Sequence, residues 1–181
     1  SKPLAGKSAL ITAGPTREPI DPVRYLSNHS SGKQGYAVAS ALADLGAEVT
    51  LVSGPVSVPA PINVTLVKVE TAREMLAACQ KALPADIFVS LAAVADWRPD
   101  GVAARKIKKD KSGIPPLKLL ENPDILHSIS NVDERPKLVI GFAAETDNII
   151  EHARAKLAKK GCDWIIADDV SGDVMGGDNN K

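Results

Sequence analysis

A polar segment between residues 12 and 35 carries the side chains best suited to chemistry in this chain. It follows an apolar run, has Gly14 near its beginning, and ends where a helical pattern starts. Arg17, Arg24 and Lys33 can neutralise anions, and Asn28 offers a neutral amide as donor and acceptor. The free N–H groups at a helix N-terminus also favour negative charge. The segment therefore predicts a site for an anionic, phosphate-bearing ligand.

Neither of two common phosphate loops fits this segment. A Walker A loop places Gly five residues before Gly-Lys-Ser/Thr. Here Gly32 and Lys33 are followed by Gln34, and Ser27 stands at the position that should be Gly. A dinucleotide fingerprint requires G-x-G-x-x-G directly after the strand, whereas Gly14 stands alone until Gly32. Both standard interpretations are excluded.

Continuous aliphatic runs alternate with helical patterns along the chain. Such runs are typical of strands that are covered on both faces. The strands are expected at residues 8–12, 48–53, 64–69, 87–91, 138–142 and 164–167. Alternating strands and helices indicate βαβ units with right-handed crossovers. We therefore predict an α/β fold, a three-layer Rossmann-like domain with a mainly parallel sheet, formed as a single domain by residues 1–181.

Local signals mark where the helices begin and end. Thr71 and Glu74 have the spacing of a capping box. Asn122 followed by Pro123 predicts a helix with Asn122 as its cap and proline at the first helical position. The first helix is expected to end at Gly46.

Composition excludes several classes of partner. The 181 residues contain 22 Lys and Arg against 22 Asp and Glu, so the formal net charge is zero. A zero balance argues against binding of nucleic acid or an anionic membrane, which require a basic field. No apolar run has membrane-spanning length. The two cysteines form no disulfide framework, which favours a reducing, cytoplasmic location.

In open parallel sheets, ligands bind beyond the carboxyl ends of the strands. Segments 14–33, 92–99, 120–123 and 141–146 are expected to converge there. Small residues at 92–95 suit the close approach of a flat base, although ordinary tight packing explains them equally well. A nucleotide is therefore the ligand that we expect.

Two cationic groups each have two explanations. The basic run at 105–116, which ends in Gly and Pro, is either a solvated face or a mobile lid over a triphosphate. Lys156 and Lys160 lie one helical turn apart, so they either complement the helix dipole or clamp phosphate oxygens. His29 has no metal-ligand spacing around it, and we expect no protein metal site.

A series of short motifs, which occur in the same order over nearly the whole chain, resembles phosphopantothenoylcysteine synthetase, the C-terminal half of the bacterial bifunctional coenzyme A biosynthesis protein. They are AGPTRE (13–18), DPVR (21–24), SNHSSGK (27–33), AAVAD (92–96), KIKK (106–109), NPD (122–124), GFAAET (141–146) and ADDVS (167–171). The resemblance implies a ligase that uses CTP, with Mg²⁺ held through the CTP phosphates, to join 4′-phosphopantothenate and L-cysteine through an acyl-cytidylate. It also implies a homodimer and a decarboxylase domain in the full-length protein.

The resemblance also implies roles for individual residues. Asn28 resembles the asparagine that handles the acyl-cytidylate, Lys106 resembles the lid lysine of the first step, and Arg24 falls where phosphopantothenate binds, together with Asn28. The positions that correspond to CTP binding are Gly14, Ala92, Ala93, Asp96, Lys106, Asn122, Pro123, Phe142, Lys156 and Lys160.

The chain departs from the resemblance at two places. Asp168 stands where many members have Asn, and residues 172–181 are expected to be a truncated C-terminus, because the family continues into further strands. Two alternatives stay open on the residues alone: an NAD(P)-dependent oxidoreductase on a Rossmann-like fold, and a non-catalytic nucleotide-binding module.

Overall fold

A six-stranded parallel sheet forms the centre of the computed structural model, which describes residues 1–170. Its strands, in sequence order, are β1 (Ser8–Ala13), β4 (Glu48–Ser53), β5 (Val64–Lys68), β6 (Ile87–Ser90), β9 (Leu138–Glu145) and β10 (Trp164–Asp169). They lie in the order β10-β9-β6-β1-β4-β5, and every neighbouring pair is parallel. The chain therefore reverses its direction of winding between β1 and β6, where ligands bind in such sheets.

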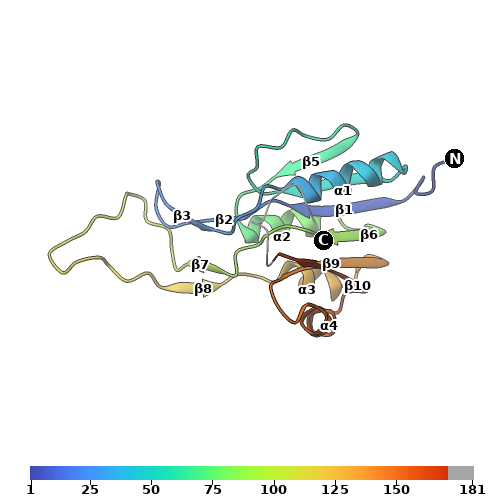
Figure 1. The fold of residues 1–181 in the computed structure, drawn as a ribbon. Coiled ribbons are helices and arrows are strands. Elements are labelled where there is room, and N and C mark those ends of the chain that lie inside the picture. The colour runs from blue at the N-terminus through green and yellow to red at the C-terminus, as the bar shows by residue number, and fades with distance from the viewer. Residues whose placement is uncertain (171–181) are drawn as a thin grey trace.

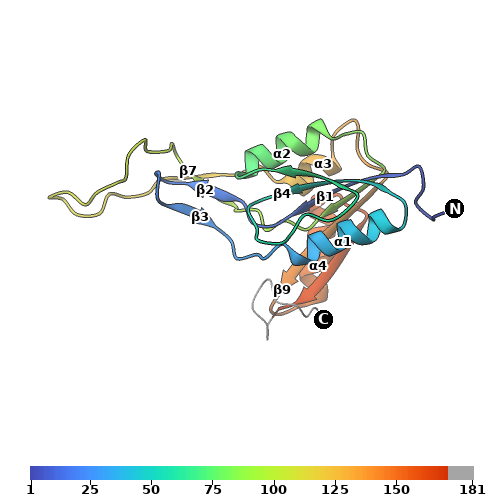
Figure 2. The ribbon, with the colours of Figure 1, turned by 90° about the horizontal axis from the view of Figure 1, so that it is seen from above.

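Helices cover both faces of the sheet, which confirms the three-layer Rossmann-like prediction (Figures 1 and 2). The helices are α1 (Lys33–Asp44), α2 (Ala72–Lys81), α3 (Ile125–Ser130) and α4 (Ile149–Lys160). Alternate residues of β1 face opposite layers. Leu10 packs in the cluster with Met75 of α2 and Ile129 of α3, whereas Ile11 packs in the cluster with Ala39 of α1. Within residues 1–170, no helix is long and apolar enough to cross a membrane.

One helix start was predicted correctly and one was not. The Thr71 side chain accepts from the backbone N–H of Glu74 and forms the complete capping box of α2. By contrast, the cap of α3 is Asp124, whose carboxylate accepts from the His127 N–H, and the prediction of Asn122 as the cap is wrong. The physical reason is that the amide of Asn122 donates to the carbonyl of Ala95 instead, at 2.8 Å.

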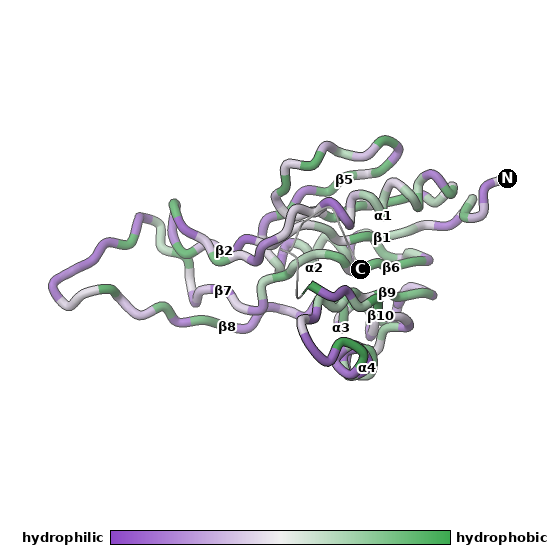
Figure 3. Tube along the Cα trace, viewed as in Figure 1, coloured by the Kyte–Doolittle hydropathy of each residue, from purple (hydrophilic) through white to green (hydrophobic). Residues whose placement is uncertain are grey.

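Two short antiparallel ribbons extend beyond the sheet and were not expected from the sequence. β2 (Arg17–Pro19) pairs with β3 (Tyr25–Ser27), and β7 (Trp97–Pro99) pairs with β8 (Leu119–Glu121). We call residues 17–27 the hairpin and residues 97–121 the arm. The arm projects far from the sheet (Figures 1 and 2), and its outer part is coloured mainly as hydrophilic (Figure 3). Residues 172–181, expected to be a truncated terminus, lie outside the described part of the chain.

Candidate functional site

The loop after β1 runs beside the loop after β6, at the point where the strand order reverses. Pro15 forms a parallel bridge with Ala93. The N–H of Ala93 donates to the carbonyl of Gly14 at 2.9 Å, and the N–H of Ala95 donates to Thr16 Oγ1 at the same distance. Thr16 is completely buried, so this hydrogen bond between the two loops is protected from water. The predicted convergence of these loops is therefore observed.

Glycines bring the start of α1 against the end of β1. Gly14 and Gly32 have φ values of 75° and 77°, which side-chain-bearing residues rarely adopt. A Cβ at Gly32 would lie 2.7 Å from the Val56 side chain, and one at Gly35 would lie 2.4 Å from the Ala13 Cβ. This close packing places a helix N-terminus at the carboxyl edge of the sheet, where it favours an anion.

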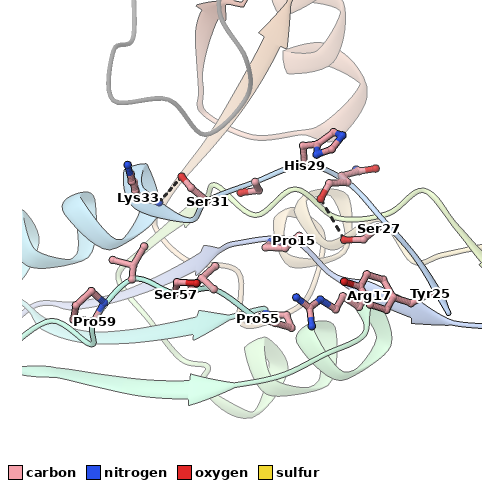
Figure 4. Close-up of a pocket in the computed structure, with 14 residues that line it drawn as sticks. Pro15, Arg17, Tyr25, Ser27, His29, Ser31, Lys33, Pro55, Ser57 and Pro59 are labelled. Carbon is pink, nitrogen blue, oxygen red and sulfur yellow. Dashed lines mark hydrogen bonds between the residues drawn. The ribbon is translucent and has the colours of Figure 1, made fainter. Parts of the chain in front are cut away.

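A cleft of about 980 Å³ opens beside this helix N-terminus (Figure 4). Its walls come from the hairpin, the segment before α1 and the segment after β4. The lining residues are Pro15, Arg17, Tyr25, Ser27, Asn28, His29, Ser30, Ser31, Lys33, Pro55, Val56, Ser57, Val58 and Pro59. Hydroxyl groups and two cationic side chains thus face a single space, which suits a phosphorylated ligand.

Asn28 connects the cleft to the loop after β6. Its Nδ2 donates to the carbonyl of Val94 at 3.1 Å. In the same region the backbone N–H of Asn122 donates to the carbonyl of Asp96 at 2.8 Å, and the Ala92 N–H donates to Thr12 Oγ1 at 3.3 Å. Of the predicted site residues, Gly14, Asn28, Ala92, Ala93, Asp96 and Asn122 are therefore brought together at one edge of the sheet.

The Asn122 side chain is engaged with the protein on several sides. Its Nδ2 donates to Glu18 Oε1 at 3.0 Å and to the carbonyl of Ala95, while its Oδ1 accepts from Arg98 at 3.4 Å. Glu18 is buried and also accepts from the N–H of Ala72 at the start of α2. Burial raises the pKa of the Glu18 carboxyl above its ordinary value, although these hydrogen bonds oppose the rise. Asn122 thereby fixes the arrangement of the loops around it.

A second group of predicted residues gathers around α4. The Lys156 ammonium donates to the carbonyl of Phe142 at 2.5 Å, and burial, reinforced by the charge of Lys160, lowers the pKa of Lys156. Lys160 forms an ion pair with Asp124, the residue after Pro123. Burial is the largest single influence and raises the pKa of Asp124, but the hydrogen bonds from Lys160 and from the His127 N–H, with the nearby positive charge, together outweigh it, so the net shift is downward. Both lysines are thus held by protein oxygens, Lys156 on β9 and Lys160 at the start of α3.

The remaining two predicted residues lie on the projecting elements. Lys106 is exposed on the arm, which extends away from β9 and α4 (Figure 1). Arg24 follows the turn of the hairpin, and its guanidinium donates to the carbonyl of Ile107 at 3.3 Å. The structure therefore brings Arg24 and the backbone beside Lys106 together, but it does not bring Lys106 to Phe142 or Lys156.

The sequence interpretation named Arg17 as an anion-binding side chain but missed Tyr25 and residues 55–59, which also line the cleft. The Arg17 guanidinium lies 4.7 Å from the centroid of the Tyr25 ring, and both side chains line the cleft. Residues 55–59 line the opposite wall. Their position just after β4, at the carboxyl edge of the sheet, was a signal that could have identified them.

Asp168, whose role the sequence leaves open, connects β10 to the start of α1. Gln34 Nε2 donates to Asp168 Oδ2 at 3.4 Å. Within the described residues there is no group of three or more His, Cys, Asp or Glu side chains arranged to hold a metal ion.

The fold and this edge define an α/β domain of Rossmann topology with a polar cleft at its strand switch point. The sequence profile of the family described as "DNA/pantothenate metabolism flavoprotein C-terminal domain" matches residues 4–181. The chain belongs to this family, which confirms the resemblance drawn from the motifs.

Similar proteins agree with this assignment. The "Coenzyme A biosynthesis bifunctional protein CoaBC" of Vibrio vulnificus (strain YJ016) is 54% identical over 177 residues, which cover 97% of this chain and 44% of that protein. The protein of the same name from Escherichia coli (strain K12) is 52% identical over 176 residues, covering 94% of this chain and 43% of that protein. The crystal structure of the C-terminal domain of a CoaBC protein has a TM-score of 0.81 and 46% identity, covering 94% of this chain and 81% of that one. The chain thus spans less than half the length of these curated relatives.

Proposed function

We propose that this domain is a CTP-dependent ligase that joins 4′-phosphopantothenate to L-cysteine and produces phosphopantothenoylcysteine, CMP and pyrophosphate. Family membership supports the reaction class. The observation that carries the proposal is the convergence of Gly14, Asn28 and Ala93 beside the N-terminus of α1, because this edge combines anion-favouring groups with backbone that a flat base can approach.

The proposed reaction has two steps that balance without a redox partner. First, a carboxylate oxygen of phosphopantothenate attacks the α-phosphorus of CTP, and the bond to the departing pyrophosphate breaks. Then the cysteine amine attacks the acyl carbon of the acyl-cytidylate, loses a proton, and CMP leaves. Both steps develop negative charge on oxygen, which fixed cations and amide donors stabilise.

Individual residues have distinct roles in this proposal. The phosphates of CTP lie toward the start of α1, Lys156 and Lys160 approach phosphate oxygens, and the cytosine lies against the loop after β6. Asn28, already an amide donor to the Val94 carbonyl, turns its amide to the acyl oxygen in the second step. Since no carboxylate cluster is found within residues 1–170, Mg²⁺ fits as an ion held by triphosphate oxygens, whose charge it would neutralise.

The hairpin and the arm complete the proposed site. Arg24 binds the anionic end of phosphopantothenate, and Lys106 stabilises charge in the first step. Exposed apolar side chains accompany them, with Tyr25 49% and Trp97 58% exposed. Such side chains fit an interface with a second copy of this chain, and we propose a homodimer in which these elements meet. The decarboxylase domain and the cytoplasmic location stay predictions from the sequence.

Pyrophosphate release from CTP tests the proposed function. We expect release that requires phosphopantothenate and Mg²⁺, and full product only when cysteine is added. Release that does not depend on phosphopantothenate would contradict the proposal. If a titration monitored by NADPH fluorescence showed saturable binding of NADPH, that result would instead support the oxidoreductase alternative. Binding of CTP with no turnover under any of these conditions would favour the non-catalytic module.

An Asn28→Asp variant separates the two steps. The substitution replaces the amide donor with a carboxylate that cannot donate to the acyl oxygen, so we expect pyrophosphate release to continue and an acyl-cytidylate to accumulate, detected by mass spectrometry. Loss of the first step alone would show that the role assigned to Asn28 is wrong.

A further inference from the structure

The carboxylate of Asp21 joins the hairpin to the arm. Its Oδ1 accepts from the N–H groups of Val23 and Arg24, both at 2.9 Å. Its Oδ2 accepts from the N–H of Ile107, also at 2.9 Å, although 86 positions separate the two residues in sequence. One oxygen thus serves the hairpin turn and the other serves the arm.

Two further hydrogen bonds support this junction. The N–H of Ala103 donates to the carbonyl of Ile20 at 3.0 Å, and the Arg24 guanidinium donates to the carbonyl of Ile107. The same guanidinium lies 3.6 Å from Asp21 Oδ2. The side chain of Asp21 has no exposed surface, so competition from water is reduced. The arm is therefore fastened to the hairpin at residue 103 and, within the segment 105–116 expected to be a mobile lid, at residue 107.

The junction lies between the two residues that the first step requires. Lys106 immediately precedes Ile107, and Arg24 donates across the same junction. Because the backbone at Ile107 is bonded to the turn that precedes Arg24, the distance between the Lys106 and Arg24 side chains is restricted. Reactions that join two bound substrates depend strongly on such alignment.

We propose, building on the function proposed above, that Asp21 is a positioning residue that holds the arm against the hairpin so that Lys106 and Arg24 act as one unit in the first step. Asp21 itself contacts neither substrate. It aligns the lysine that stabilises developing charge with the arginine that holds phosphopantothenate.

The charge of Asp21 suits this role. The hydrogen bond from the Ile107 N–H is the largest cause that holds the pKa of this carboxyl below its ordinary value, and the bonds from Val23 and Arg24 add to it. Asp21 therefore remains anionic at neutral pH and can accept on both oxygens. An Asn at this position keeps one acceptor oxygen for the hairpin turn but presents an NH₂ group toward the N–H of Ile107. Asp21→Asn thus disrupts the arm contact selectively.

The test compares Asp21→Asn with the wild type and with Asp110→Asn. Asp110 is a matched control because it lies on the same arm, and its carboxylate accepts from the N–H and the hydroxyl of Ser112 within the arm itself. Amide hydrogen exchange by NMR follows the N–H groups of Ile107, Val23 and Arg24 without substrates. Pyrophosphate release then gives kcat and the KM for CTP.

We expect Asp21→Asn to lose exchange protection at Ile107 while Val23 and Arg24 remain protected. Turnover should fall by about tenfold to a hundredfold with little change in the KM for CTP. When Asp21→Asn is introduced into the Lys106→Gln variant, turnover should fall much less than when Asp21→Asn is introduced into the wild type. The reason is that Asp21 acts through the alignment of Lys106, and the Lys106→Gln variant has already lost that lysine. Asp110→Asn should resemble the wild type throughout.

Three results would overturn the proposal. The first is an Ile107 amide that exchanges rapidly in the wild type, and the second is wild-type turnover in Asp21→Asn despite a lost contact. The third is full additivity with Lys106→Gln, which would indicate a general structural role. If the wild type releases no pyrophosphate at all, the proposed function fails and the positioning role fails with it. An active wild type with any of the three results rejects the positioning role alone.

Discussion

The parallel sheet and the pair formed by hairpin and arm are held together by different forces. In the sheet, Leu10, Leu51 and Phe88 are completely buried and pack against helices. In the arm, Val102 is 58% exposed and Ile114 is 85% exposed, and long-range hydrogen bonds, such as that from Ile107 to Asp21, secure the segment. The sheet thus supplies stability, whereas the projecting elements carry exposed cations on backbone that a few hydrogen bonds hold in place.

The difference follows from the magnitudes of the two forces. Full burial of one large apolar side chain stabilises the fold by about 1.5 to 3 kcal/mol, and these contributions add up over all the side chains of the core. A single hydrogen bond contributes about 1 kcal/mol net. A segment secured by a few such bonds can be displaced when substrates bind without unfolding the domain.

The largest expected effect is on the sheet. Phe88→Ala removes a fully buried ring from β6, and we expect the free energy of unfolding to fall by about 3 to 5 kcal/mol because a cavity remains. Ile114→Ala on the arm should change it by about 0.5 kcal/mol or less, since that side chain is already in water. Urea unfolding measures both. Equal losses in the two variants would remove the contrast between the regions.

The next expected effect is on activity through the arm. Lys106→Gln replaces the ammonium with a neutral amide on a slightly shorter side chain and so removes its charge, and we expect the rate of the first step to fall about a hundredfold. The free energy of unfolding should change by about 0.5 kcal/mol or less, because Lys106 is exposed. Pyrophosphate release and urea unfolding are measured on the same sample. Unchanged release would exclude the arm from the chemistry.

The smallest effect is expected at Glu18, where the two regions meet. Because burial raises its folded-state pKa above 4.5, the folded state binds this proton more tightly than the unfolded state. Its favourable contribution is therefore present below pH 4.5 and is lost as the pH rises through the folded-state pKa. Glu18→Gln should flatten this decline when urea unfolding is measured between pH 4 and 7. Parallel pH profiles for the two proteins would show that Glu18 titrates normally.

The sequence predicted the sheet well because its strands are long and aliphatic. It also identified the capping box at Thr71, since both partners lie within one turn. It assigned Asn122 incorrectly as a cap because the competing partners, Glu18 and Ala95, are distant in the sequence. Local periodicity carries no information about such contacts.

The projecting elements could not be predicted for a related reason. Their strands contain three residues each, which is too short for a period-2 pattern to show. The contact between Asp21 and Ile107 spans 86 positions. The motifs supplied the residues of the proposed site, but the separation of Lys106 from Phe142 and Lys156 emerged only in three dimensions.

A crystal structure of the domain with CTP tests the central claim most directly. We expect the triphosphate beside the N-terminus of α1, between Gly14 and Asn28, and the cytosine against the loop that contains Asp96. The Lys156 ammonium should exchange the Phe142 carbonyl for a phosphate oxygen. A nucleotide bound away from this edge of the sheet, with Lys156 still on Phe142, would contradict the account.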